Sequence, residues 1–372
     1  MNKGLNGLKE KVLDSDLCTV CGACLSLCPY LGSWKGRVVK LDHCNLEEGR
    51  CFAYCPRTEV DLDLVYRTIF GKSYEEIEMG PFRKIVMARC KDPLITRKAQ
   101  TGGVVSALID FALKGGVIQA AVLTPRDGDL LPRGKIVTNR KGVLNAAGSS
   151  YVSGATLEAL NRGPWKETEQ IGVVGLPCQV LSLARMKASK LEKRTPIHRV
   201  HLVIGLFCTW ALDYRTFTAF LKERVNGLPI KKLNMTPPPE RLFEVTSGNK
   251  TIRIPVDEIR PFIRPGCQVC MDMTAELSDI SVGTVEGKEG WNTVILRTEV
   301  GERLLKRAKK AGFVETRPLP KDHLTHLIEA SLLKKRRALD ALKERGGIEK
   351  SYLTLSPRLM KRIVSASEET NS

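Results

Sequence analysis

The sequence lacks long apolar runs, and its first residues lack the apolar stretch that a secretion signal carries. A membrane-spanning helix needs a run of about 18 or more apolar residues, and none occurs in the 372 residues. The N-terminal segment, MNKGLNGLKEKVLDSDLC, contains no apolar h-region. We therefore expect no transmembrane segment and a cytoplasmic location.

Internal repeats and low-complexity tracts are also absent, and aromatic residues are scarce, at 6% of the chain. Apolar residues make up 42% and charged residues 27%, a balance that excludes wholesale disorder. A chain of 372 residues has room for two or three domains with buried cores. The composition is that of an ordinary globular protein.

Cysteine, by contrast, is abundant, with 12 residues. Thiols stay reduced in the cytosol, so we expect metal ligands rather than disulfides and turn to the spacing of the cysteines. One set is dense and N-terminal: Cys18, Cys21, Cys24, Cys28, Cys44, Cys51 and Cys55. The other set is dispersed: Cys90, Cys178, Cys208, Cys267 and Cys270.

The run Cys18-x2-Cys21-x2-Cys24-x3-Cys28-Pro29 matches the ligand run of bacterial ferredoxins. Thiolates at steps of three let a short loop wrap one 4Fe–4S cluster, while the fourth cysteine reaches a neighbouring cluster. A zinc site would need two separated pairs. A c-type haem would need a histidine after Cys21, where Gly22 stands. The run therefore predicts an iron–sulfur module.

The second half of this module, Cys44-x6-Cys51-x3-Cys55-Pro56, departs from the ferredoxin pattern. A standard run has a further cysteine three residues before Cys44, where Leu41 stands. Pseudo-symmetry assigns one 4Fe–4S cluster to Cys18, Cys21, Cys24 and Cys55. Cys28, Cys44 and Cys51 would then hold a second cluster that is short of one ligand. That second site could be a 3Fe–4S centre or recruit Cys90, Asp42 or His43. A single N-terminal cluster with spare thiols is the alternative.

Strands and helices alternate through the rest of the chain, which predicts an α/β domain. A helix is expected over Val104–Leu113, with Thr101 near its N-cap and Gly115-Gly116 closing it. Strands are expected at 117–123, 171–175, 200–207, 280–283 and 293–296, and helices at 140–162, 179–190 and 212–225. Pro237-Pro-Pro239 predicts a loop, 241–247 and 250–254 a hairpin, and 61–84 a connection.

Two dispersed cysteines follow predicted strands, Cys178 after 171–175 and Cys208 after 200–207. The carboxyl edge of a sheet is where ligands collect in α/β domains, so these two and the pair Cys267-x2-Cys270 could hold another cluster. The pattern alone is weak, because a buried cysteine is often a small apolar residue. A lone Cys-x2-Cys also fits zinc or redox chemistry.

From about Arg83 to about Pro318 the chain resembles the beta subunit of coenzyme F420-reducing hydrogenases and its relatives in formate and other dehydrogenases. The resemblance is carried by seven runs in one order: Gln100-Thr-Gly-Gly-Val-Val105, Gly148-Ser-Ser-Tyr151, Gly175-Leu-Pro-Cys-Gln179, Gly205-Leu-Phe-Cys208, Pro265-Gly-Cys-Gln-Val-Cys-Met-Asp272, Ala275-Glu-Leu-Ser-Asp-Ile-Ser-Val-Gly283 and Gly290-Trp-Asn-Thr-Val-Ile-Leu-Arg-Thr298. It implies FAD and a 4Fe–4S cluster in this domain, the cluster held by Cys178, Cys208, Cys267 and Cys270. A ferredoxin module ahead of the domain is also found in the family.

The resemblance further implies where the flavin lies. The helix start at Gln100, Thr101, Gly102 and Gly103 offers free N–H groups and a positive dipole end suited to a pyrophosphate, although an ordinary helix cap is the alternative. Gly148, Ser149, Ser150 and Tyr151 would help enclose the flavin. Asp279, Ser281, Trp291 and Thr293 are candidate pocket residues, with core and turn packing as their alternative. The family commonly has lysine before this tyrosine, so Ser150 points to a changed flavin environment or hydride partner.

The expected fold is an α/β flavin-binding domain with an N-terminal ferredoxin-like iron–sulfur domain and a C-terminal helix. The boundaries are 1–62 for the ferredoxin-type module, 63–84 for a connector, 85–318 for the FAD and 4Fe–4S domain, and 319–372 for a basic helix and tail. The helix should run from about Asp322 to Arg345, with an apolar side.

These parts predict an oxidoreductase subunit. F420 carries hydride and clusters carry single electrons, so FAD must lie between them. The expected partners are other redox subunits of hydrogenase, formate dehydrogenase or heterodisulfide-reductase-like enzymes. Two alternatives remain: another donor, such as NADH or ferredoxin, in an electron-bifurcating complex, or a wiring subunit that has lost the hydride site.

The chain is strongly basic, with 59 Lys and Arg against 41 Asp and Glu, a formal charge of +18. The run Lys334-Lys-Arg-Arg337 lies on the C-terminal helix, where a solvated face is its simplest interpretation. No nucleic-acid-binding motif accompanies the charge, so we expect no nucleic-acid partner. Acidic ferredoxin-like carriers, or F420 with its phosphate and oligoglutamate tail, explain it better.

Overall fold

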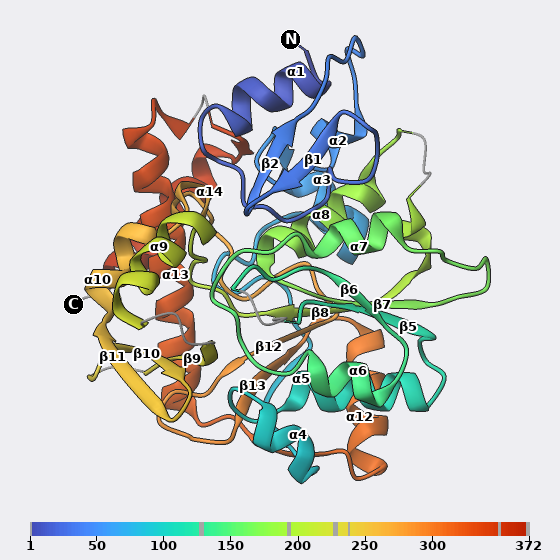
Figure 1. Ribbon diagram of the computed structural model, residues 1–372, viewed down its shortest axis with the longest axis vertical. Helices are drawn as coiled ribbons and strands as arrows, with labels where there is room; N and C mark the ends of the chain where they lie inside the picture. The colour runs from blue at the N-terminus through green and yellow to red at the C-terminus, as the bar shows by residue number, and fades with distance from the viewer. Residues whose placement is uncertain are drawn as a thin grey trace.

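The computed structural model describes residues 2–125, 130–191, 195–225, 230–236, 239–348 and 351–369. Its centre is an eight-stranded sheet in the order β14-β4-β13-β12-β8-β7-β5-β6 (Figure 1). Four adjacent strands run parallel: β5 (Ala120–Leu123), β7 (Ile171–Gly175), β8 (Val200–Leu206) and β12 (Ile280–Thr284). The remaining strands pair antiparallel: β4 (Lys84–Cys90), β6 (Lys135–Val137), β13 (Asn292–Leu296) and β14 (Val314–Pro318). A mixed α/β fold is confirmed.

The parallel strands are mostly apolar and buried because helices cover both faces of the sheet. Every residue of β5 and β7 is buried. The five strands expected from the sequence are all present, with β5 starting at Ala120 rather than residue 117. The sequence analysis did not identify β4, β6 or β14, which are antiparallel strands at or near the sheet edges.

Helices form a layer on each side of this sheet (Figure 1). One core contains buried residues of α5 (Val104–Lys114) and α12 (Glu299–Lys310), and α4 (Pro93–Lys98) and α6 (Arg140–Asn145) lie on that side. The opposite core contains residues of α7 (Thr156–Arg162) and α8 (Pro177–Ala188). The remaining short elements are α9 (Tyr214–Val225), α10 (Val256–Ile259), α11 (Pro265–Gln268), η2 (Pro196–Arg199) and η3 (Arg260–Phe262).

The single helix expected over 140–162 is wrong. The segment forms two helices, α6 and α7, with a loop between them. Gly148 has φ +111° and Tyr151 has φ +59°, and neither value is compatible with a right-handed helix. The helices expected at 179–190 and 212–225 are confirmed as α8 and α9.

The N-terminal cysteine-rich module has its own small core and sits against α7 and α8 (Figure 1). Its elements are α1 (Leu5–Leu8), the π-helical turn η1 (Lys9–Leu13), the hairpin β1 (Leu31–Trp34) and β2 (Arg37–Lys40), and α2 (Arg50–Ala53). The Asn161 side chain on α7 donates hydrogen bonds to the carbonyls of Ala23 and Leu25 at 3.0 and 2.8 Å. The module is therefore joined to the α/β domain by buried contacts as well as by the chain.

A separate three-stranded sheet contains β9 (Ile230–Met235), β10 (Leu242–Ser247) and β11 (Lys250–Pro255). The hairpin predicted for this region is confirmed by the antiparallel pair β10 and β11. The predicted loop at Pro237-Pro-Pro239 lies mostly outside the described residues, because positions 237 and 238 are not described.

The C-terminal segment returns across the molecule to the N-terminal module. Its helix α13 (Lys321–Glu344) confirms the predicted helix, and α14 (Pro357–Glu369) follows it. Between them, β15 (Leu353–Thr354) pairs in parallel with β3 (Val60–Asp61), which precedes α3 (Leu62–Phe70). Among the described residues, no helix is both long and apolar enough to cross a membrane.

Candidate functional site

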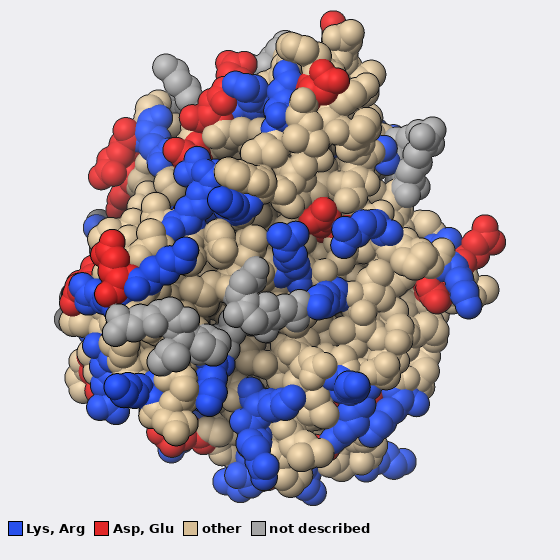
Figure 2. All heavy atoms as spheres, in the orientation of Figure 1, with Lys and Arg blue, Asp and Glu red and all other residues tan. Residues whose placement is uncertain are grey.

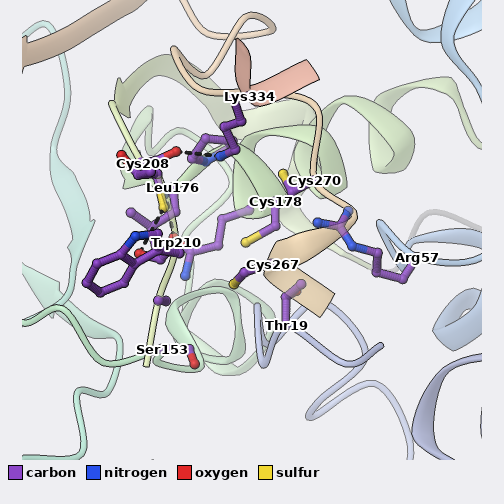
Figure 3. A pocket seen from close by; sticks show the side chains of 14 residues that line it. Thr19, Arg57, Ser153, Leu176, Cys178, Cys208, Trp210, Cys267, Cys270 and Lys334 are labelled. Atoms are coloured by element: carbon purple, nitrogen blue, oxygen red, sulfur yellow. Dashed lines mark hydrogen bonds between the residues drawn. The ribbon is translucent and has the colours of Figure 1, made fainter. Parts of the chain in front are cut away.

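The four dispersed cysteines that follow Cys90 in the sequence line one cavity at the carboxyl edge of the parallel strands. Cys178 is the second residue of α8, directly after β7, and Cys208 follows β8. Cys267 lies in α11, and Cys270 follows two residues after that helix ends. Figure 3 shows these thiols with Lys334 on one side of the group and Arg57 on the other. We call these four the core cysteines.

The core cysteines have strongly perturbed acidities. Burial raises the pKa of Cys208 to about 12 and raises that of Cys267. Burial, then the neighbouring Cys21, also raises the pKa of Cys178. Cys270 differs: burial raises its pKa, but Lys334 and Arg57 lower it more, and the net shift is downward. Cations therefore favour thiolate at one position of an otherwise neutral thiol set.

The N-terminal cysteines fall into two groups, and in each group the neighbouring thiols raise the pKa of at least one member. Burial, with Cys21 and Cys18 contributing, raises the pKa of Cys55 to about 12. Burial is the largest cause that raises the pKa of Cys24, followed by the other three members of this group and then by Cys51. The group contains Cys18, Cys21, Cys24 and Cys55. The structure thus brings together the four residues that pseudo-symmetry pairs, and their role as ligands stays a prediction.

The second N-terminal group contains Cys28, Cys44 and Cys51. Burial raises the pKa of Cys51 to about 11, with Cys28 as the next cause and Cys44 contributing. Leu41, which stands at the missing cysteine position, is 62% exposed. Asp42 and His43 are also exposed. Within the described ranges, no three His, Cys, Asp or Glu side chains have the spacing of a single-ion site.

Cys90 lies apart from both N-terminal groups. It is buried in β4, in the core shared with α5, and its thiol accepts a hydrogen bond from the N–H of Asp92 at 3.3 Å. A Cβ built on Gly103 would lie 3.1 Å from the Cβ of Cys90. The structure therefore gives Cys90 a packing position in the α/β domain. Asp42 and His43 remain the candidate fourth ligands within the module.

One buried hydroxyl joins the N-terminal and core cysteines. Ser182 on α8 is fully buried, and its hydroxyl donates to the backbone carbonyl of Cys178 at 2.9 Å. The same oxygen lies 3.5 Å from the sulfur of Cys21. This residue was not identified from the sequence, although it follows Cys178 by one helical turn and so faces the same way. Two candidate cluster sites are thereby in contact through one side chain.

The predicted phosphate-binding segment Gln100–Gly103 packs against the Gly290–Asn292 segment. Thr101 was expected near the N-cap of α5, and it lies two residues before the N-cap, which is Gly103 with φ +71°. Thr101 instead accepts a hydrogen bond from the side-chain amide of Asn292 at 2.6 Å. A Cβ on Gly102 would stand 2.7 Å from the Asn292 Oδ1 atom and 2.9 Å from the Gly290 carbonyl. Only glycine fits so close an approach.

Asn292 is a residue that the sequence analysis missed. Its Oδ1 atom accepts the N–H of Val104 at 3.3 Å, so one N–H group of the α5 start is already bonded. Its amide also donates to the carbonyl of Gly283 at 3.0 Å. Asn292 follows Trp291 in one of the seven runs, and that position was the available signal. It fixes the segment in which Gly102 and Gly103 lie.

The loop Gly148–Tyr151 lies beside this segment. A Cβ on Gly148 would lie 3.6 Å from the carbonyl oxygen of Lys98. Ser149 is exposed. The Ser150 hydroxyl is buried and has no hydrogen-bond partner among the described residues. A buried hydroxyl of this kind is suited to a ligand group that bonds it.

The three-stranded sheet of β9, β10 and β11 packs against the same region. Gln100 donates to the Asn234 side chain on β9 at 2.5 Å. The Tyr151 ring packs edge-on against Phe243 on β10, with 5.3 Å between ring centroids. Burial raises the pKa of Tyr151 to about 12. The structure thus brings the Gln100 and Tyr151 runs together under one sheet.

The other predicted pocket residues bond within the protein. Asp279 precedes β12 and accepts hydrogen bonds from the Val203 N–H at 2.8 Å and the Thr298 hydroxyl at 2.6 Å. Ser281 accepts from the buried Arg297 side chain at 2.7 Å. These contacts match the packing alternative for both residues. A flavin role for them stays a prediction.

Thr293 and Trp291 also contact protein groups. The Thr293 hydroxyl donates to the carbonyl of Thr284 at 3.1 Å. The buried Trp291 ring contacts the guanidinium groups of Arg89 and Arg317, which lie 4.8 and 4.9 Å from its centroid. A flavin role for Thr293 and Trp291 likewise stays a prediction.

The interpretation of the basic run of α13 as a solvated face does not hold at two of its four positions. Lys334 is 6% exposed and Lys335 is 1% exposed. The Lys334 ammonium donates to the carbonyls of Cys208 and Asp272, at 2.5 and 2.7 Å. Lys335 pairs with the buried carboxylate of Glu276. The missed signal is spacing, since Lys335 occupies the apolar stripe of the helix with Leu332, Leu339 and Leu342.

Comparison with known proteins gives a consistent result. Residues 85–161 match the N-terminal family model of the coenzyme F420 hydrogenase/dehydrogenase beta subunit, and residues 168–322 match the C-terminal model of the same family. The coenzyme F420 hydrogenase subunit beta of Methanothermobacter thermautotrophicus is 30% identical over 275 residues, which cover 72% of this chain and 98% of that protein. The coenzyme F420-dependent sulfite reductase of Methanocaldococcus jannaschii is 28% identical, covering 79% of this chain and 46% of that protein.

A solved structure of the F420-reducing NiFe hydrogenase complex from Methanosarcina barkeri contains a similar chain. It superposes with a TM-score of 0.68 and 28% sequence identity, and the match covers 74% of this chain and 97% of the other. The shared fold, the two consecutive family matches and the near-complete coverage of a beta subunit agree. The chain therefore belongs to the family of coenzyme F420 hydrogenase and dehydrogenase beta subunits, which are subunits of oxidoreductases.

Proposed function

We propose that this chain is an iron–sulfur flavoprotein subunit that converts hydride from a carrier such as coenzyme F420 into single electrons for a partner redox subunit. FAD, when bound, supplies this chemistry because it takes up two electrons together and releases them one at a time. The cysteine sets would hold 4Fe–4S clusters, which carry one electron each. Relatives named as F420-dependent hydrogenase, sulfite reductase and formate dehydrogenase proteins support the choice of carrier.

The observation that carries this proposal is the contact between the core and N-terminal cysteines. Ser182 touches Cys21 with its hydroxyl and bonds the backbone of Cys178 with the same atom. Clusters held at these two sites would be separated by one buried side chain, an arrangement that would suit one-electron exchange between them. The four core thiols fit a cluster because they line one cavity from three separate segments. Among the described residues, the lining of this cavity contains no His, Asp or Glu side chain.

The residues near α5 fit a flavin with a pyrophosphate. Gly102 packs closely against Asn292, which fixes the segment before α5 and bonds the N–H of Val104. The next N–H groups of the α5 start would face the pyrophosphate. The unpartnered Ser150 hydroxyl offers a hydrogen bond, and Gln100 is held by Asn234. These residues would orient the cofactor and exclude water from one side of it. The loop Gly148–Tyr151 would cover the other side of the cofactor.

Anaerobic purification with cofactor analysis tests the proposal directly. We expect FAD and roughly 8 to 12 iron atoms per chain with matching sulfide. Adding reduced F420 should bleach the bound flavin, and the sample should then reduce an artificial one-electron acceptor. Cys18→Ser should remove N-terminal iron and slow only the second step. Zinc in place of iron and sulfide would refute the proposal.

The choice of donor separates the alternatives. Bleaching by NADH and not by F420 would assign the chain to a complex that uses another donor. Intact clusters with bound flavin that neither donor bleaches would indicate a wiring subunit. The absence of flavin from a cluster-loaded chain would show that the Ser150 difference has removed the hydride chemistry.

A further inference from the structure

Two buried cations flank the core cysteines, and they come from opposite ends of the chain. Arg57 belongs to the N-terminal module and is 2% exposed. Lys334 belongs to α13 and is 6% exposed. Both line the cavity that the four core cysteines form (Figure 3). Both also lie outside the residue ranges 85–161 and 168–322 that match the family.

Arg57 is held in place by backbone carbonyls. Its Nε atom donates to Gly266 at 3.0 Å and its Nη1 atom donates to Pro56 at 2.8 Å. Its guanidinium lies over the Tyr352 ring, 4.8 Å from the centroid. Its Nη2 atom is buried without a partner among the described residues. Arg57 follows Cys55-Pro56 in the N-terminal module, and its side chain lines the cavity of the core cysteines.

Lys334 approaches the core cysteines from the other side. Its ammonium donates to the carbonyl of Cys208, which belongs to the core set, and to the carbonyl of Asp272, two residues after Cys270. Both bonds are to neutral acceptors. In the described part of the chain, neither Lys334 nor Arg57 has a carboxylate oxygen within ion-pair distance. Two positive charges are thus buried chiefly among dipoles and thiols, and the buried Asp272 carboxylate interacts with Lys334 from beyond ion-pair distance.

Burying a charge is unfavourable unless opposite charge compensates it. A 4Fe–4S cluster with four thiolate ligands carries net negative charge, which grows by one on reduction. Net charge and hydrogen bonding around the sulfurs are the factors that set a cluster's reduction potential. A fixed cation in a water-poor site stabilises the reduced form more than the oxidised form, because the attraction acts at low dielectric.

We infer that Arg57 and Lys334 are positioning residues that raise the reduction potential of the core cluster, so that it accepts electrons more readily than the same four cysteines alone would allow. The inference rests on the proposed function, since it requires a cluster at the core cysteines. It also gives the N-terminal module and the C-terminal helix a direct part in the redox chemistry of the family domain. Neither residue needs to touch the flavin or its hydride donor.

The test is a redox titration of the anaerobically purified full-length chain in which electron paramagnetic resonance monitors the cluster signals. The core signal is the one that disappears in Cys267→Ala. Lys334→Gln and Arg57→Gln should each shift the reduction equilibrium of that signal at least about tenfold toward the oxidised form, which is 59 mV for one electron. Lys334→Arg and Arg57→Lys keep the charge and should restore most of the potential. Arg337→Gln, which removes an exposed charge one turn along the same helix, should leave it unchanged.

The outcomes distinguish a failure of the role of the two cations from a failure of the proposed function. If the glutamine variants retain their iron and the core signal titrates at the wild-type potential, the role of the cations is refuted while the proposed function stands. If the unmodified chain has no core iron, the proposed function fails and the inference fails with it. Because the two residues lie on different elements, a cluster lost from one glutamine variant leaves the other to decide. Equal shifts in Lys334→Gln and Arg337→Gln would also contradict the inference.

Discussion

Buried cysteines in this chain have two different surroundings, which predict two different responses to substitution. Cys267 faces a cavity with three other thiols, whereas Cys90 is packed in the sheet core. Cys267→Ala should remove the core iron and lower the thermal midpoint, because a metal that joins three segments contributes its binding energy to folding. Cys90→Ala should keep all iron and cost about 1 kcal/mol of packing. Iron, sulfide and the melting midpoint measure both effects, and equal iron in the two variants would contradict the assignment.

Tyr151 gives a prediction that depends on pH. Its hydroxyl interacts with the backbone of Met235, and burial raises its pKa to about 12 from an ordinary value of 10.0. Its protonated form therefore contributes stability that is complete below pH 10 and lost as the pH rises through 12. At pH 8, Tyr151→Phe should be less stable by about 1 kcal/mol. Between pH 10 and 12 the wild type should lose about 1.4 kcal/mol more per pH unit than the variant.

Denaturant unfolding of both proteins at pH 8 and pH 11 measures this difference. The difference in unfolding free energy between the wild type and Tyr151→Phe should become smaller or change sign at pH 11. A constant difference across the range would show that the tyrosine ionises as freely in the folded chain as in the unfolded one. The phenylalanine variant keeps the ring packing against Phe243, so it isolates the hydroxyl.

For single residues, the sequence predicted the grouping of the N-terminal thiols better than the contacts of the polar side chains. The N-terminal thiol grouping follows from local spacing, which is why pseudo-symmetry anticipated it. The roles of Thr101 and Asn292 could not be read in the same way, because their hydrogen bond joins residues 191 positions apart. The burial of Lys334 was missed because a lysine next to other basic residues suggests a solvated surface.

The C-terminal helix shows how one element depends on a buried ion pair. Lys335 on α13 is 1% exposed and pairs with Glu276, which also accepts a hydrogen bond from Tyr66. Removing one partner leaves an uncompensated buried charge, so Lys335→Met and Glu276→Gln should each cost about 3–5 kcal/mol. The double variant should cost clearly less than the sum of the two. Chemical denaturation of the single and double variants measures this coupling, and additive effects would contradict it.

The elements themselves were largely predictable. The parallel strands β7, β8 and β12 are apolar runs bounded by turns, and each was expected near its observed position. The error at 140–162 came from reading two helical segments as one across Gly148 and Tyr151, whose left-handed backbone breaks the helix. The antiparallel strands β4 and β14 were missed because they pair with partners far away in the sequence.

In the whole molecule, the N-terminal module and the C-terminal segment both pack against the family domain. This packing brings the three groups of cysteines together. Arg264 donates to the carbonyl of Cys18 at 3.1 Å and pairs with Asp213 at 2.8 Å, fixing the N-terminal module to the segment that carries Cys267. The strand pair β3 and β15 joins the end of the module to the C-terminal segment. This arrangement could not be predicted from the sequence, because no local pattern specifies which distant segments meet.

The charge of the molecule gives the last prediction. The formal charge is +18, and Lys and Arg outnumber Asp and Glu on the face seen in Figure 2, chiefly over α4, α5, α6 and α12. The candidate flavin segments lie at the start of α5, with exposed Lys98 beside Gly148. A polyanionic carrier such as F420 should be attracted to this face. Its dissociation constant should therefore rise steeply as salt exceeds about 0.1 M.

Titration of F420 binding at several salt concentrations measures this slope. Lys98→Gln should weaken binding at low salt and flatten the slope, whereas Lys190→Gln, an exposed charge beyond α8 on the other side of the sheet, should change neither. A carrier with a shorter glutamate tail should bind with a shallower slope, since it presents fewer charges. Affinity that does not change with salt would mean that the charge serves a protein partner instead. In that case, competition by an acidic ferredoxin at low salt would identify the partner that the basic face attracts.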